Sequence, residues 1–168
     1  MKKLLLTAAL VLFLTNTTTA QTSEGTILIG TNIGNAMVGG TNIGFTSVDG
    51  ESTLSIGADA GYFIMDDLAL KVGLGYSSNS LADSNTFAYR LGAKYYLMGK
   101  LPLTLDFTGA SVKDAEENPS WLGLGAGYAI FLTENISLEP GLRYNLTMND
   151  DYTEENVFQF NVGFALHF

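Results

Sequence analysis

Residues 157–168 alternate between one wholly apolar face and one face that is mainly small or polar. The apolar face consists of Phe158, Phe160, Val162, Phe164, Leu166 and Phe168. Because successive side chains of a strand point to opposite faces, this period of two predicts a β-strand rather than a helix. The pattern recurs in six earlier segments, at residues 53–64, 68–77, 87–97, 103–108, 122–130 and 136–147. The chain is therefore expected to be all-β.

The face opposite the apolar one distinguishes between the folds that alternation allows. A soluble barrel or sandwich turns its apolar face inward, whereas a transmembrane barrel turns it outward to lipid. Here the opposite face combines glycines with seven charged side chains, namely Asp59, Lys71, Arg90, Lys94, Asp106, Glu139 and Arg143. A soluble surface would carry more charge and less glycine, while a narrow lumen needs small residues and a few charges that can pair. The pattern therefore favours a transmembrane barrel.

The connections between the predicted strands alternate between tight and loose. Residues 65–67, 98–102 and 133–135 form tight connections, and residues 48–52, 79–85, 111–120 and 148–155 form longer polar ones. Short periplasmic turns and longer outer loops are typical of outer-membrane barrels, which in bacteria have an even number of strands. With seven strands from Thr53 onward, one strand is expected before residue 49.

That N-terminal stretch is ambiguous, because it contains the sequence TNIG twice, at residues 31–34 and 41–44. Two strands there would give nine, so a single strand is preferred. It is either one long or bulged strand or a strand at residues 36–47 after a periplasmic lead, which leaves the role of residues 25–35 open. Both alternatives predict an eight-stranded antiparallel up-and-down transmembrane β-barrel.

The first 20 residues have the order of a secretory signal peptide. Lys2 and Lys3 precede an apolar run at residues 4–14, and residues 18–20 supply a small-residue cleavage site after Ala20. The expected organisation is a signal peptide at residues 1–20 and an outer-membrane barrel at residues 21–168. Removing both lysines changes the formal charge from −9 to −11, and so acidic a chain is not expected to bind nucleic acid.

Two local patterns resemble those of a known family. The C-terminal sequence NVGFALHF resembles the outer-membrane assembly signal at Asn161, Gly163, Leu166 and Phe168, although an aromatic residue is more usual at the position of Leu166. The sequences GYFIMDDLAL at residues 61–70 and YAIFLTENISL at residues 128–138 resemble each other and the hairpins of the OmpX/OmpA-like, porin-like family of small outer-membrane β-barrels.

This resemblance covers the chain after residue 20 and points to Gram-negative bacteria, the Bacteroidetes among them. It implies a location in the outer membrane and insertion by the barrel-assembly machinery, which reads the last strand. The expected partners are outer-membrane lipid and lipopolysaccharide, and the chain is expected to be a monomer. Aromatic residues near the predicted strand ends suggest interfacial girdles, with Tyr62, Tyr95 and Tyr128 at the turns and Tyr76, Phe87, Trp121 and Tyr144 at the loops.

The sequence offers little material for catalysis or metal binding. It has no cysteine, and His167 is its only histidine, with no local motif that would place a serine beside it. No enzyme activity, cofactor or metal is therefore predicted. The inward charges are expected to pair with one another and fill the lumen, which indicates a structural or surface-interaction role. The alternative is a narrow porin-like channel lined by Arg90, Lys94 and Arg143, with Asp59 and Glu139 as counter-charges.

Overall fold

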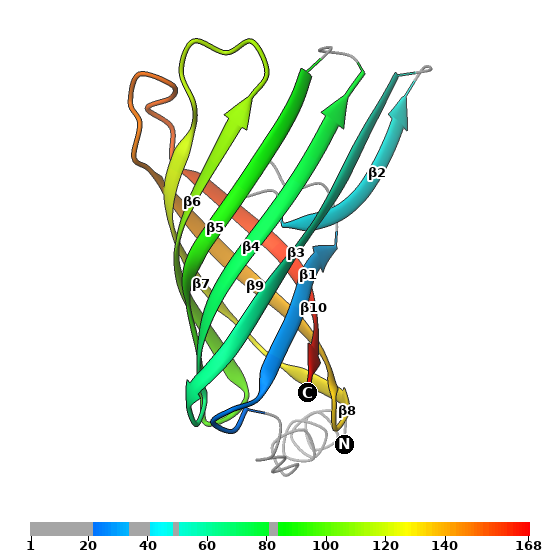
Figure 1. Ribbon diagram of the computed structural model, residues 1–168, viewed down its shortest axis with the longest axis vertical. Coiled ribbons are helices and arrows are strands. Elements are labelled where there is room, and N and C mark those ends of the chain that lie inside the picture. Colours follow the sequence, from blue (N-terminus) through cyan, green and yellow to red (C-terminus); the bar gives the residue numbers. More distant parts are fainter. Residues whose placement is uncertain (1–21, 34–40, 49–50, 81–83) are drawn as a thin grey trace, which may run out of the picture.

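The computed structural model describes residues 22–33, 41–48, 51–80 and 84–168, so the predicted signal peptide lies outside the described residues. Ten strands form one sheet that closes on itself (Figure 1). They are β1 (Ile27–Ile33), β2 (Asn42–Val48), β3 (Glu51–Met65), β4 (Leu68–Asn79), β5 (Ser84–Leu97), β6 (Leu101–Val112), β7 (Ser120–Gly127), β8 (Ile130–Thr133), β9 (Ile136–Thr147) and β10 (Val157–His167). Within the described ranges, no helix is long and apolar enough to span a membrane.

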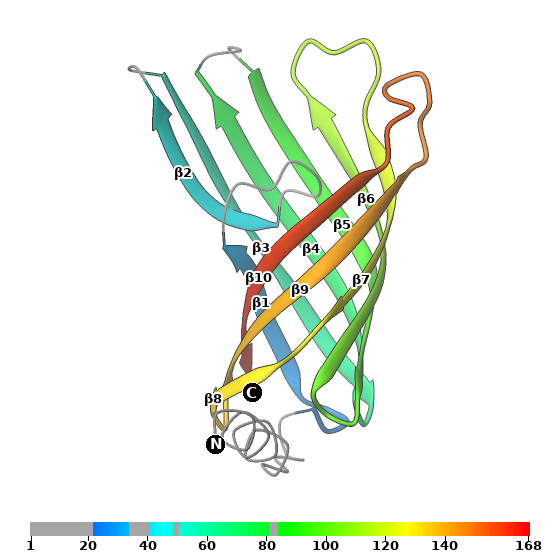
Figure 2. The same cartoon turned by 180° about the vertical axis from the view of Figure 1, so that it is seen from behind.

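The sheet closes because β10 pairs with β9 on one side and with β1 on the other, both antiparallel. From β3 to β7 each strand pairs with the next along the chain. On the β1 side, the ladder of β10 covers residues 162–167. Towards the loops, residues 157–161 of β10 have ladder partners only on β9, among the residues that the structure describes. Figure 2 shows β2 bending away from β10 at this place.

The prediction of a single N-terminal strand was wrong. Residues 27–33, whose role was open, form β1, and residues 42–48 form a separate strand. Both strands are antiparallel to β3, β1 along residues 59–62 and β2 along residues 51–55. The TNIG repeat meets itself in register, because Asn32 pairs with Asn42 and Ile33 with Ile43 in a short parallel ladder. The repeat therefore marks the end of β1 and the beginning of β2.

The second break in the wall separates β7 from β8, which both pair with β9. The Tyr128 N–H donates to the carbonyl of Pro140 on β9, at 3.0 Å. The return hydrogen bond cannot form, because proline has no N–H. The next amide, of Ala129, donates instead to the Lys100 carbonyl in the β5–β6 turn at 2.7 Å. These two breaks account for ten strands where eight were predicted. β1 and β2 share one edge of β3, and β7 and β8 share one edge of β9.

The apolar face points outward, as predicted. On β3, for example, Ile56 and Tyr62 are 58% and 53% exposed, whereas Asp59 is 4% exposed. Apolar side chains outside and polar ones inside are the arrangement of a transmembrane β-barrel. Trp121, expected in an outer girdle, instead points inward and is buried.

The turns after β3, β5 and β8 lie at one end of the barrel, and the longer connections after β6 and β9 lie at the other (Figure 1). Asp67 and Met98 adopt positive φ angles of 66° and 56° in two of the tight turns. The C-terminus lies at the turn end (Figure 1), where Phe168 and Ile27 exchange two backbone hydrogen bonds of 2.9 Å. Both hairpin sequences that resemble each other, around residues 66–67 and 134–135, form turns at this end.

Candidate functional site: the charged lumen

All seven charged residues singled out from the sequence line the same cavity inside the barrel. Asp59 comes from β3, Lys71 from β4, Arg90 and Lys94 from β5, Asp106 from β6, and Glu139 and Arg143 from β9. Each side chain is at least 89% shielded, since the largest exposed fraction among them is 11%, at Lys71. Five strands thus contribute to one buried layer of charge.

Glycines make room for this layer, because they lie beside the charged residues on neighbouring strands. The cross-strand pairs are Asp59 with Gly73, Gly73 with Arg90, Lys71 with Gly61 and Gly92, Asp106 with Gly92 and Gly123, Arg143 with Gly125, and Glu139 with Gly163. A Cβ added at Gly92 would overlap the Asp106 Cβ and the Leu105 carbonyl oxygen. The lumen face is therefore rich in glycine because its large charged side chains need the space beside them.

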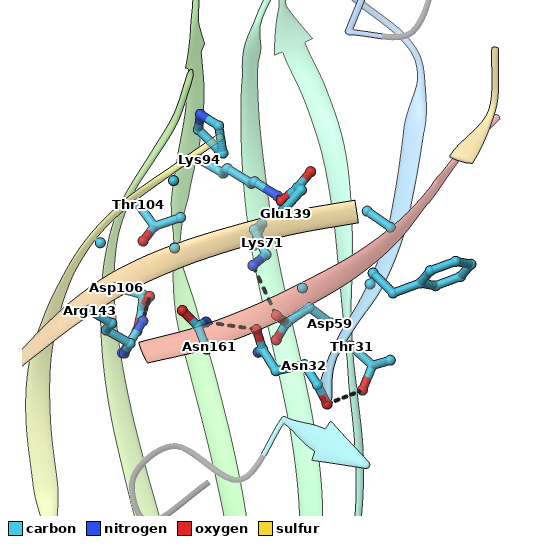
Figure 3. A pocket seen from close by; sticks show the side chains of 18 of the residues that line it. Thr31, Asn32, Asp59, Lys71, Lys94, Thr104, Asp106, Glu139, Arg143 and Asn161 are labelled. Carbon is cyan, nitrogen blue, oxygen red and sulfur yellow. Dashed lines mark hydrogen bonds and ion pairs between the residues drawn. The ribbon is translucent and has the colours of Figure 1, made fainter. Parts of the chain in front are cut away.

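The larger part of the layer is a chain of alternating charges across the bore (Figure 3). Lys71 Nζ lies 2.9 Å and Arg90 Nη1 3.4 Å from Asp59 Oδ2. Arg90 Nε then approaches Asp106 Oδ1 at 3.4 Å. Arg143 holds the same carboxylate with two hydrogen bonds of 2.6 Å, the bidentate geometry typical of strong arginine–carboxylate pairs.

The smaller part of the layer surrounds Glu139, nearer the turns. Its carboxylate accepts hydrogen bonds from Lys94 Nζ, from the Tyr96 hydroxyl at 2.7 Å and from the Ser137 hydroxyl at 3.0 Å. The Lys94 ammonium also lies 4.8 Å from the centre of the Tyr96 ring. This cluster satisfies a buried carboxylate with three donors, so its charge is compensated without solvent.

Aromatic side chains close the turn end of the lumen below this cluster. Phe63, Tyr96, Phe131 and His167 form a group with ring centroids 5.5–6.3 Å apart. Phe63 and Tyr96 are fully buried, and Leu28 packs in the same core cluster. The aromatic group and the charged layer together occupy the turn end and the middle of the bore.

Ser137 and His167 come close together, which was not foreseen from the sequence. Ser137 Oγ lies 3.1 Å from His167 Nε2. In a hydrolytic triad an acid orients the histidine, whereas here Glu139 contacts the serine instead. Both residues are at least 99% buried. No substrate can therefore reach the hydroxyl in this structure, and the contact is part of the packing at the turn end.

Polar side chains line the lumen on the loop side of the charged layer. Ser55 Oγ and Ser77 Oγ are 3.0 Å apart, and Asn145 Nδ2 donates to Gln159 Oε1 at 2.7 Å. In the described residues, no group of three or more histidines or carboxylates is arranged to hold a metal ion. The loop half is thus uncharged and polar, and the charges gather in the middle of the barrel.

The proposed assembly-signal residues occupy the turn-side half of β10 and the residue that follows it. Asn161 donates to Asn32 Oδ1 on β1 at 2.8 Å, where the β1–β10 ladder ends, and Gly163 pairs with Glu139 on β9. Leu166 pairs with Ile29 on β1, and Phe168 is 62% exposed. Sequence reasoning missed Tyr96 and Ser137, which donate to Glu139, and Thr108, whose hydroxyl donates to Asp106 Oδ1 at 3.0 Å. The alternating pattern shows that an uncharged side chain points inward, but it does not show whether that side chain makes a hydrogen bond.

Comparison with known proteins gives a result only at the level of structure. No family model and no curated protein matches the chain. The N-terminal β-barrel domain of Pseudomonas aeruginosa OprF matches with a TM-score of 0.52 and 16% identity, covering 86% of this chain and 98% of that chain. The Yersinia pestis outer membrane protein Ail, in a phospholipid bilayer nanodisc, matches with a TM-score of 0.51 and 14% identity, covering 87% and 99%.

The chain therefore has the fold of the small outer-membrane β-barrels. Its resemblance to the OmpX/OmpA-like barrels, first visible in two hairpins and the last strand, is confirmed as a likeness of fold.

Proposed function

We propose that this chain is an integral β-barrel of the outer membrane of a Gram-negative bacterium, with a structural or surface-interaction role and a closed lumen. The observation that carries the proposal is the buried layer of ion pairs across the bore, with the aromatic group beneath it. Moving an ion through such a layer would require at least one buried pair to separate, and a separated buried charge is costly.

The outer surface supports the membrane location. Large apolar side chains on the wall are 40–70% exposed, for example Leu74 at 60%, Leu91 at 62% and Phe160 at 68%. Apolar surface gains about 25 cal/mol per Å² when it leaves water, so an apolar belt of this kind favours lipid strongly. Lipid and lipopolysaccharide are the proposed partners of this belt, with the barrel-assembly machinery as the partner of β10, the barrel being a monomer.

The loop end is the proposed surface for external contacts. The connection after β6 carries Asp114, Glu116 and Glu117, and the connection after β9 carries Asp150, Asp151, Glu154 and Glu155. Both connections are mainly exposed. A partner with basic or cationic chemistry suits such loops, because opposite charges speed and orient association. Catalysis forms no part of the proposed role.

Two measurements test the proposal. Membrane fractionation with a heat-modifiable gel shift tests the location, and recovery of the chain in the soluble periplasm would refute it. Planar-bilayer recording of the purified barrel tests the closed lumen, for which no steady conductance above the lipid baseline is expected. Regular single-channel steps would instead support the second candidate, a narrow porin-like channel, which the cavity of about 80 Å³ inside the charged layer favours.

A further inference from the structure

The cavity inside the charged layer has room for a small ligand. Its volume is about 80 Å³, and a single water needs about 10–15 Å³ measured in this way. Charged side chains line one part of it, and Asn32, Asn161 and the neighbouring residues of β1 and β10 line another. Figure 3 shows Lys71 and Asp59 at its centre, with Asp106 and Arg143 to one side.

The charges along this cavity do not balance. The alternating chain that crosses the bore contains three cations, Lys71, Arg90 and Arg143, but only two carboxylates, Asp59 and Asp106. The remaining two lumen charges, Lys94 and Glu139, pair with each other and cancel. The described charged residues of the lumen therefore have a net charge of +1. A charge without a counter-charge is costly away from bulk water.

Lys71 is where the excess charge faces the cavity. Its ammonium has three donors, and among the described residues its one ion-pair partner is Asp59 Oδ2, which it shares with Arg90. Its side chain is also the most exposed of the lumen charges, at 11% against 5–8% for the others. The second oxygen of Asp59 lies against Gly73 on the wall.

We infer that the lumen cavity binds one small monovalent anion, a halide or a short carboxylate, against the Lys71 ammonium. The anion makes the layer electrically neutral and accepts hydrogen bonds from donors that Asp59 leaves free. The cavity admits an anion of a few heavy atoms, and the bulkier six-carbon gluconate serves as the comparison anion. The inference is independent of the proposed function, since a barrel with a closed or a conducting lumen could hold the anion.

The test compares thermal unfolding of the purified chain in detergent micelles, in sodium chloride, formate or gluconate at equal ionic strength. A ligand that binds only the folded state raises Tm as its concentration rises, by about 3 °C per tenfold increase above its Kd. We expect this rise in chloride or formate but not in gluconate. It should be lost in Lys71→Met and kept in Lys71→Arg and in the loop control Lys113→Met.

The two arms identify the anion: a rise in chloride alone assigns a halide site, and a rise in formate alone assigns a carboxylate site. Equal Tm values in all three salts would overturn the inference, as would an unchanged chloride effect in Lys71→Met. If Lys71→Met does not fold, crystals of the unaltered protein soaked in bromide and in formate decide the matter. Density for one of these anions beside Lys71 Nζ is expected, and its absence from the cavity in both soaks would overturn the inference.

Discussion

Asp106→Asn is the substitution that most directly tests whether the lumen charges hold the barrel together. Asp106 accepts two hydrogen bonds of 2.6 Å from Arg143 and one of 3.0 Å from the Thr108 hydroxyl, and it lies 3.4 Å from Arg90 Nε. Asparagine keeps one acceptor oxygen but presents an NH₂ group to a guanidinium, so one of the two short hydrogen bonds becomes a clash of donors. The excess positive charge of the lumen also rises by one.

Removing one partner of a buried ion pair costs about 3–5 kcal/mol. We expect a loss of this size in the free energy of unfolding, measured by urea titration in detergent micelles with the fluorescence of Trp121. The corresponding fall in the urea midpoint is roughly 1–2 M. The matched control is Asp114→Asn in the β6–β7 loop, whose side chain is 84% exposed and lies 3.8 Å from Lys113. An exposed pair of this kind contributes at most about 1 kcal/mol.

The double variant Asp106→Asn with Arg143→Met separates the ion pair from the general effect of altering the lumen. Its loss should be smaller than the sum of the two single losses by about 1–3 kcal/mol, because the Arg143 guanidinium is then no longer present to lack its carboxylate. Two results would refute the reasoning. One is an Asp106→Asn variant no less stable than Asp114→Asn, and the other is strict additivity in the double variant.

The remaining predictions concern packing, a hydrogen bond and assembly. Gly92→Ala should cost about 3 kcal/mol in urea titration, because its Cβ meets backbone atoms that cannot yield, whereas Gly61→Ala, with its nearest contact at 3.3 Å, should cost less than about 1 kcal/mol. Tyr96→Phe removes a hydrogen bond donated to a buried carboxylate and should cost about 1.5–3 kcal/mol in the same assay; no change would show that the bond is not needed. Phe168→Ala should lower the heat-modifiable fraction in cell membranes without slowing refolding in micelles, and the equally exposed Phe158→Ala, outside the assembly signal, should do neither.

The alternation of side chains determined the class of fold and the direction in which each face points. A period of two in the sequence predicts strands. The face that carries glycines and charges must point inward, and the apolar face must point outward to lipid. The inward direction of the seven charged side chains followed from the alternation alone. Each of them is flanked along its strand by residues of the apolar face, so it must point to the opposite face. The seven strands from β3 to the C-terminus were located in this way, with one of them interrupted.

The tertiary structure decided the breaks in the wall and the partners inside it. Pro140 interrupts its neighbour across the sheet, not its own strand, so the gap between β7 and β8 is invisible in the sequence around Tyr128. The TNIG repeat suggested two strands, but only the ladder shows that they share one edge of β3.

The same limit applies to the charged lumen. The alternation shows which side chains point inward, but the stagger between strands sets their position along the barrel axis. A shift of two residues on one strand would keep every side chain on its face and change all of its cross-strand neighbours. The pairing of Asp106 with Arg143, and the space left in front of Lys71, therefore depend on the closed barrel. Side-chain direction is a local property of a strand, whereas ion pairing across a lumen depends on the register of all the strands at once.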